Sequence, residues 1–247
     1  MRRSTASCEA VANLHKVLAR AVALLSTQEL EARVAVLEPL VTEARRERLR
    51  RVTNDRVGSI TLLLDSLHDP FNGAAVIRSC DVFGVPTLHV IERGEPFFAS
   101  TTVSRGSEKW VDVVAHGSAQ GAVDALVGEG FELIAAEPDG ELSVSALGEE
   151  RGKIALVLGN ERDGIALDVR RRCARSVVIP MRGFAESLNV SVTTAILLHE
   201  LTRGRPGDLP PLERSRRYLR GLLQTIERSR EVLEAADLPI PAPTAGT

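Results

Sequence analysis

The side chains best suited to chemistry lie in three glycine-containing segments, each of which begins in or follows a short apolar run. The segments are 72–84, 158–164 and 179–192, and their candidate side chains are those of Asn72, Arg78, Glu161, Ser187 and Asn189. A guanidinium, a carboxylate, amides and a hydroxyl can together orient a polar substrate and stabilise developing charge. Because ligands of α/β proteins gather at the carboxyl ends of strands, we expect a binding site in these loops.

Each of the five residues also has an ordinary structural explanation. Asn72 can cap the helix that follows it, and Ser187 can cap the apolar helix after it. Arg78 can pair with Asp81 one turn later, and Glu161 can be a turn residue. Taken one at a time, the residues favour these structural interpretations. The case for a site therefore depends on their occurring together.

Short apolar runs alternate with helical segments through the middle of the chain. Strands are predicted at Ile60–Asp65, Thr87–Glu92, Glu132–Glu137, Ile154–Leu158 and Val177–Ile179, and helices at Gly73–Phe83, Ala119–Glu129, Ile165–Arg172 and Leu188–Thr202. Uninterrupted apolar strands are typical of sheets that are covered on both sides. We therefore expect an α/β fold, with a parallel sheet and helices on both faces.

Helical segments are predicted on both sides of this region. Residues 7–50 have apolar positions at helical spacing and are expected to form two helices, with Pro39 kinking or dividing the second. A linker at 204–211 leads to a charged helix at 212–236, and the tail from Pro239 is expected to be disordered. The predicted organisation is a partly basic helical segment 1–56, an α/β domain 57–205, and a linker, basic helix and tail 206–247.

Arginine supplies nearly all the positive charge, in runs, although the net charge is only −2. Solvated helix faces paired with nearby Glu explain any one run. A guanidinium also binds phosphate oxygens two at a time, so the runs in the flanking segments are candidate phosphate contacts. These candidates are Arg45, Arg46, Arg48, Arg50, Arg51, Arg56, Arg214, Arg216, Arg217 and Arg220, and a further run covers 170–175.

The remaining composition argues against several classes of protein. Cys8, Cys80 and Cys173 include no CxxC pair, which argues against a zinc site or a disulfide framework and favours a reducing compartment. The histidines have no metal-ligand spacing, so no metal is expected. No apolar run approaches the roughly 20 residues of a membrane span. His15 and Lys16 interrupt the apolar stretch near the N-terminus, so we expect a cytoplasmic protein without a signal peptide.

The three segments, in this order and spacing, resemble the three motifs of the SpoU branch of the trefoil-knot (SPOUT) methyltransferases. The most specific string is SLNVSV after IPM and a glycine, within 179–192, whereas GNE with a later glycine is weaker alone. Residues 104–111, SRGSEKWV, are similar to the tRNA guanosine 2′-O-methyltransferases of this family. The resemblance covers roughly residues 44–205. It implies a deep knot, bound S-adenosylmethionine and a homodimer.

The resemblance also implies a role for individual residues. Asn72, Arg78, Glu161, Ser187 and Asn189 would form the catalytic set, and the cofactor pocket would be lined by Ala136, Gly159, Ile179, Met181 and Leu188. Small or apolar residues suit that pocket, because adenine packs against flat apolar walls and bonds to nearby backbone. A cofactor without a pyrophosphate also explains why no G-x-G-x-x-G fingerprint is needed.

The implied reaction is an in-line displacement, in which a ribose 2′-oxygen attacks the methyl carbon of a sulfonium. The methyl donor is already activated, so the enzyme must mainly align the reactants, exclude water and help the hydroxyl lose its proton. The family assigns the base role to the counterpart of Arg78. Because a guanidinium stays protonated in proteins, we favour a different role, in which Arg78 stabilises the alkoxide and clamps the neighbouring phosphate.

The substrate implied by the resemblance is a guanosine, at position 18, in the tRNA D-loop. Residues 1–43 form a longer helical segment than expected for such tRNA enzymes, and this favours the alternative of an rRNA 2′-O-methyltransferase. A catalytically silent RNA-binding module is expected to lack Arg78 or Asn189, and both are present. A nicotinamide dehydrogenase needs a glycine fingerprint after the first strand, and residues 65–68 do not provide one.

Overall fold

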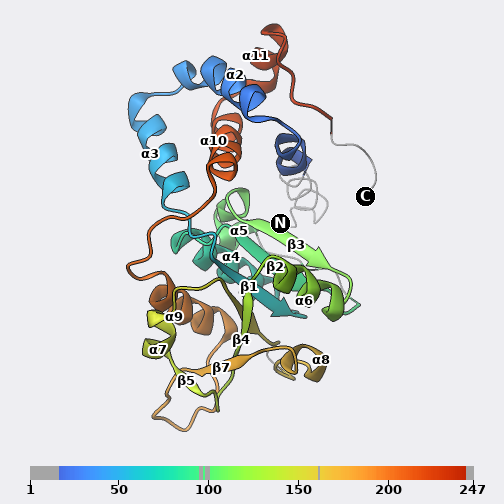
Figure 1. Cartoon of the computed structure of the whole chain (residues 1–247), viewed down its shortest axis with the longest axis vertical. Helices are drawn as coiled ribbons and strands as arrows, with labels where there is room; N and C mark the ends of the chain where they lie inside the picture. The colour runs from blue at the N-terminus through green and yellow to red at the C-terminus, as the bar shows by residue number, and fades with distance from the viewer. Residues whose placement is uncertain (1–16, 95–96, 98–100, 161, 243–247) are drawn as a thin grey trace, which may run out of the picture. The chain divides into compact units, whose positions relative to one another are not determined.

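The computed structural model describes residues 17–94, 97, 101–160 and 162–242 (Figure 1). The chain divides into two compact units. One unit is Val57–Pro206, and the other combines Met1–Arg56 with Gly207–Thr247. The two segments that flank the α/β region are thus grouped in one unit, which their separation in the sequence did not suggest.

The Val57–Pro206 unit is built on a parallel sheet of seven strands. The strands are β1 (Ile60–Asp65), β2 (Thr87–Ile91), β3 (Asp112–His116), β4 (Glu132–Ala136), β5 (Leu142–Ser143), β6 (Ile154–Leu158) and β7 (Arg175–Val178). Their order in the sheet is β3-β2-β1-β6-β4-β7-β5, and every pair is parallel. The predicted parallel α/β fold is therefore confirmed.

Helices cover both faces of this sheet (Figure 1). One face packs against α4 (Pro70–Val82), α7 (Val144–Glu149) and α9 (Val190–Thr202), and the other against α6 (Ala119–Gly128) and α8 (Leu167–Arg170). Successive side chains of a strand point to opposite faces. Leu62 and Leu64 of β1 accordingly lie in the first core and Leu63 in the second. Burial on both faces explains why β1 and β6 are continuously apolar.

Several elements differ from the prediction, which included neither β5 nor α7 and began α8 two residues before Leu167. Helix α4 begins before Gly73, because the Asp69 side chain caps it by accepting a hydrogen bond from the Phe71 backbone. Helix α9 begins at Val190 rather than Leu188, with Asn189 as its cap. Strand β3 was not predicted, because an edge strand that is partly exposed has neither a continuous apolar run nor a clear alternation. Short α5 (Thr101–Ser104) and η2 (Ser107–Lys109) pack against α4.

The flanking unit is helical. It contains a helix at 17–23, α2 (Thr27–Leu37), η1 (Glu38–Leu40), α3 (Glu43–Asn54), α10 (Pro211–Thr225) and α11 (Ser229–Ala235). The predicted division at Pro39 is confirmed, since η1 separates α2 from α3. The single helix predicted for 212–236 is wrong: it is interrupted before Ser229, where Arg228 has a left-handed φ of 59°. Predictions for 7–16 and for the tail at 243–247 lie outside the described residues.

Helix α10 holds the flanking unit together by packing against α2 and α3. The Tyr218 hydroxyl of α10 donates to Glu38, and Arg50 of α3 donates to the same carboxylate oxygen at 2.6 Å. Burial and the Glu38 hydrogen bond raise the pKa of Tyr218 to about 12. No helix in the described part of the chain is long and apolar enough to cross a membrane.

Candidate active site

The predicted site residues gather along one edge of the sheet, where the parallel strands end. Strands β1, β6, β4 and β7 are consecutive neighbours in the sheet, so the loops after them start side by side. The loop after β1 leads to Asn72, and the loop after β6 begins with Gly159. The loop after β4 follows Ala136, and the loop after β7 carries Ser187 and Asn189. Glu161 lies outside the described residues. Segments far apart in the sequence thus meet at one edge.

A direct hydrogen bond joins the first and third motifs. The Asn189 side-chain nitrogen donates to Asn72 Oδ1 at 2.9 Å. Asn189 Oδ1 accepts from the Ser191 backbone at 2.8 Å and from the Ser191 hydroxyl at 2.6 Å, so the backbone of α9 fixes which end of the amide faces Asn72. The alternative explanations of Asn72 and Ser187 as helix caps are both wrong, because Asp69 and Asn189 cap those helices.

Arg78 is exposed on α4 and forms neither an ion pair nor a hydrogen bond within the part of the chain that the structure describes. It does not pair with Asp81, whose carboxylate instead accepts from the Ser107 hydroxyl at 3.1 Å. Arg78 lies six residues after Asn72, which on an α-helix places it about 120° around the axis and about 9 Å further along. Its side chain therefore does not share the face of α4 that carries Asn72.

Two glycines allow backbone segments to approach closely at this edge. A Cβ on Gly159 would lie 2.0 Å from the Gly164 carbonyl carbon, and one on Gly140 would lie 2.4 Å from the Val177 carbonyl carbon. Neither neighbour is a flexible side chain, so no other residue fits without moving the loop. Gly140 was missed by the sequence analysis. The Pro138-Asp139-Gly140 turn directly after β4 is a signal that could have located it.

The predicted cofactor residues differ in exposure. Ala136 and Ile179 are half-buried and pack against the core, and Met181 is also half-buried. Leu188 is 39% exposed, and Ser187 is exposed on the same loop. Half-buried apolar walls beside closely packed backbone can hold a flat heterocycle. Within the described residues there is no cluster of His, Cys, Asp and Glu that could hold a metal.

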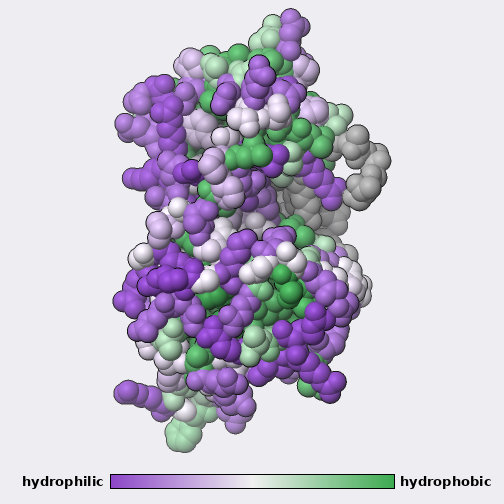
Figure 2. Space-filling model, in the orientation of Figure 1, coloured by the Kyte–Doolittle hydropathy of each residue, from purple (hydrophilic) through white to green (hydrophobic). Residues whose placement is uncertain are grey.

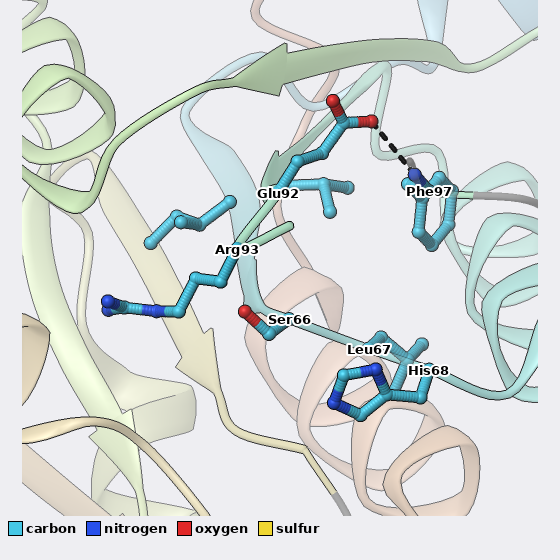
Figure 3. A pocket seen from close by; sticks show the side chains of 8 residues that line it. Ser66, Leu67, His68, Glu92, Arg93 and Phe97 are labelled. Carbon is cyan, nitrogen blue, oxygen red and sulfur yellow. Dashed lines mark hydrogen bonds between the residues drawn. The ribbon is translucent and has the colours of Figure 1, made fainter. Parts of the chain in front are cut away.

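A buried acidic residue was also missed by the sequence analysis. Asp65, the last residue of β1, is 1% exposed and accepts hydrogen bonds from Arg93 Nε at 2.7 Å and from the Ala166 backbone at 2.9 Å. Arg93 also donates to Asp168 at 2.7 Å, and this raises the pKa of Arg93 and lowers that of Asp168. A small pocket beside this group is lined by Ser66, Leu67, His68, Glu92, Arg93 and Phe97 (Figure 3).

The arginine runs divide into paired and unpaired side chains. In the run at 170–175, Arg170, Arg172 and Arg175 form ion pairs with nearby carboxylates, as solvated faces do. Arg56 and Arg220 are 3% and 7% exposed, so their burial argues against a role in binding RNA phosphates.

The other flanking arginines also differ. Four have partners within the flanking unit: Arg46, Arg50, Arg216 and Arg217. Arg214 is half-buried on α10. The α3 arginine stripe, which we define as Arg45, Arg48 and Arg51, is exposed and makes no ion pair among the described residues. Figure 2 shows hydrophilic side chains gathered over α3.

Comparison with known proteins identifies the family to which the α/β region belongs. A model of the SpoU rRNA Methylase family matches residues 59–199, more than half of the chain. The chain belongs to this family. Among SpoU relatives, the tRNA (guanosine(18)-2′-O)-methyltransferase of Thermus thermophilus is 34% identical over 166 residues, which span 66% of this chain and 84% of that protein. The predicted resemblance to the SpoU family is therefore confirmed.

Two other proteins are similar to this chain over different lengths. The crystal structure of the A. aeolicus TrmH/SpoU tRNA modifying enzyme has a TM-score of 0.66 and 26% identity, covering 75% of this chain and 98% of that one. That overlap is longer than Val57–Pro206, so it includes part of the flanking unit. The 23S rRNA (guanosine-2′-O-)-methyltransferase RlmB of Xanthomonas axonopodis pv. citri is 36% identical over 152 residues, 60% of each chain.

Proposed function

We propose that this SpoU protein transfers the methyl group of S-adenosylmethionine to a ribose 2′-oxygen of RNA, at a guanosine of the tRNA D-loop. The chemistry is supported by membership of a methylase family and by the meeting of the Asn72 and Asn189 amides at the carboxyl edge of the sheet. The relatives named tRNA (guanosine(18)-2′-O)-methyltransferase support position 18 as the target.

The observation that carries the choice of tRNA is the extent of the structural likeness. The structural overlap with the A. aeolicus tRNA modifying enzyme extends into the flanking unit. In sequence, the match spans 84% of the T. thermophilus tRNA enzyme but 60% of the rRNA relative. Flanking elements select among RNAs, since the catalytic domain is shared by both kinds of enzyme. The flanking unit, which contains the long N-terminal segment that favoured rRNA from the sequence, is thus partly matched by a tRNA enzyme.

The residues at the edge of the sheet fit S-adenosylmethionine, which supplies a methyl group already activated on a sulfonium. Ala136 and Ile179 offer half-buried apolar walls, and the close approach of Gly159 to Gly164 presents backbone rather than side chains. On this proposal the loops after β4, β6 and β7 form the deep knot of the family around the cofactor. Leu188 and Met181 would complete the pocket.

The polar residues would then act on the RNA. Asn189, fixed by the α9 backbone, would hold Asn72 so that the two amides orient the target ribose. Ser187 is exposed nearby and would contact the same nucleotide. Arg78 would stabilise the alkoxide that forms as the hydroxyl loses its proton to solvent, and would bind the adjacent phosphate. Glu161 is proposed for the same site from its place in the second motif.

A homodimer would explain the placement of Arg78, which does not share the face of α4 that carries Asn72. Helices α4 and α9 also expose apolar side chains, including Phe71 at 61%, Val82 at 68% and Val192 at 45%. We propose that a second copy of the chain covers this surface. A two-fold interface brings the same patch of both copies together, so Arg78 would reach the site of the partner chain.

The decisive experiment is transfer of labelled methyl from S-adenosylmethionine to tRNA transcripts and to rRNA, followed by mapping of the product nucleotide. We expect a 2′-O-methylguanosine in the tRNA D-loop, and no product when that ribose is replaced by 2′-deoxyribose. A methyl group on a base would refute the chemistry. Methylation of rRNA alone would refute the substrate and favour the rRNA alternative.

The shared site has a separate test. Arg78→Ala and Asn189→Ala are each expected to be nearly inactive. If the two are unfolded, mixed and refolded together, random pairing gives mixed dimers in which one site carries neither lesion, so roughly a quarter of wild-type activity should return. No recovery, with mixed dimers confirmed by mass, would show that Arg78 serves its own chain.

A further inference from the structure

The carboxyl edge of the sheet contains an ionic network that none of the three motifs explains. Asp65 is the last residue of β1, and its Oδ1 accepts from Arg93 Nε at 2.7 Å. Arg93 follows β2 and directs its other two nitrogens to Asp168, at 3.0 and 2.7 Å. One guanidinium thus binds two carboxylates from different parts of the chain. Figure 3 shows the Arg93 side chain extending away from the pocket that Ser66 and His68 line.

The same carboxylate also holds the end of the loop after β6. Asp65 Oδ2 accepts from the Ala166 backbone N–H at 2.9 Å, 101 residues away in sequence. Within this loop, Asn160 and Gly164 exchange backbone hydrogen bonds of 3.1 and 3.2 Å. The loop that begins at Gly159 is therefore closed on itself, and its far end is attached to β1.

Asp65 also lies at the start of the loop that leads to Asn72. The next residue, Ser66, has a left-handed φ of 57°, which is unusual for a residue with a side chain. Its backbone N–H donates to the Ile91 carbonyl at 3.2 Å, which attaches this turn to β2. Strain of this kind persists only where the surroundings enforce it. The Asp65 carboxylate is thus placed between the loops of the first and second motifs.

We propose that Asp65 and Arg93 are positioning residues, which fix the loop Gly159–Ala166 against the end of β1 and so give the cofactor pocket its shape. This inference rests on the proposed function for the identity of the cofactor. Because both carboxylate oxygens of the buried Asp65 have partners, removing Arg93 leaves a buried charge without its counter-ion, and the loop must move or open to water. Neither residue touches the reacting atoms in this proposal.

The chain offers a matched control at the opposite edge of the sheet. Arg175, the first residue of β7, also binds two carboxylates, Glu132 at 2.7 Å and Glu150 at 2.6 Å. Its guanidinium is comparably exposed, and its loss should lower stability as the loss of Arg93 does. Glu132 begins β4, so this second network lies at the amino ends of the strands. Only the Arg93 network adjoins the proposed site.

The test compares the wild type with Arg93→Ala, Arg93→Lys, Asp65→Asn and Arg175→Ala. Binding of S-adenosylmethionine is measured by titration calorimetry, KM and kcat by methyl transfer to tRNA, and backbone exposure of 159–166 by hydrogen exchange. We expect Arg93→Ala and Asp65→Asn to weaken binding and raise KM for S-adenosylmethionine by about tenfold or more, the scale for residues that orient a binding group. The kcat at saturation should fall much less, Arg93→Lys should recover part of the affinity, and hydrogen exchange of the loop should rise.

Arg175→Ala is expected to keep wild-type affinity while melting at a lower temperature. The proposal is overturned if Arg93→Ala binds as tightly as the wild type, or if Arg175→Ala loses as much affinity. If Asp65→Asn does not fold, Asp168→Asn removes only the exposed arm of the network and should weaken binding several-fold less than Arg93→Ala. A wild type that binds no S-adenosylmethionine would refute the proposed function, and hydrogen exchange of 159–166 in Arg93→Ala would then decide the positioning role alone.

Discussion

A buried histidine stacked on a half-buried one should make the Val57–Pro206 unit sensitive to acid. His89 of β2 is 5% exposed, and its Nδ1 lies 2.9 Å from Nε2 of His116 on the neighbouring strand β3. The two rings are stacked with centroids 5.2 Å apart. Burial, with a smaller contribution from His116, lowers the pKa of His89 from 6.5 to about 4. Burial also lowers the pKa of His116.

The direction and size of the effect follow from this pKa. A lowered pKa means that the folded state disfavours the protonated ring, so the stability that His89 contributes is complete above pH 6.5 and is lost as the pH falls toward 4. At pH 5 nearly all unfolded chains, but only about a tenth of folded chains, would carry the proton. Between pH 7 and pH 5 the free energy of unfolding should therefore fall by about 2 kcal/mol through this residue.

The assay is urea unfolding at pH 7, 6 and 5, followed by the fluorescence of Trp110, the single tryptophan, which lies two residues before β3. His89→Leu keeps a buried side chain that cannot ionise, and it should remove most of this loss of about 2 kcal/mol. His68→Gln removes an exposed histidine of the same unit and should retain the wild-type pH dependence. Equal pH dependence in His89→Leu and wild type would refute the reasoning.

Three further predictions concern the site and the RNA surface. Gly159→Ala places a Cβ against the Gly164 backbone, so the affinity for S-adenosylmethionine, measured by calorimetry, should fall at least about tenfold. Unchanged affinity would show that the loop can relax around the added methyl group. Replacing the α3 arginine stripe by Gln should weaken tRNA binding and flatten its salt dependence in filter-binding assays, because fewer phosphates are neutralised. The control Arg172→Gln, which breaks an existing ion pair, should change neither. An unaltered salt dependence of tRNA binding would show that the stripe is a solvated helix face. Asp69→Ala removes the side chain that caps α4 and should lower the free energy of unfolding in urea by about 1 kcal/mol. The kcat should also fall if α4 orients Asn72, and an unchanged kcat would show that the cap does not affect the site.

Local patterns in the sequence determined the elements that are buried on both faces. The strands at Ile60–Asp65 and Ile154–Leu158 were predicted to the residue, because a strand buried on both faces is mostly apolar. Helices α4, α6, α8 and α9 were located to within a few residues for a similar reason, since each presents apolar side chains to the sheet, whereas α7 was missed. Edge strand β3 carries no such signal, and the interruption before Ser229 depends on a left-handed Arg228 that periodicity does not reveal.

The three motifs were also visible in the sequence, but their contacts were not. Asn72 and Asn189 are 117 residues apart, and which residue caps each helix was settled by geometry that favoured Asp69 and Asn189. No local pattern shows that Arg78 has no partner in the described part of the chain, whereas Arg175 has two. The spacing of residue types thus identified the candidates, while their pairing depended on strand order.

Tertiary structure alone decided the burial and the partners of Asp65. Asp65 is a single acidic residue after an apolar run, and no local pattern indicates that it is buried. Its partners come from the end of β2 and from the loop after β6, which the sheet order places on either side of β1. Propensity and periodicity act over a few residues, whereas a buried charge is stabilised by groups that only the completed sheet brings within hydrogen-bond distance.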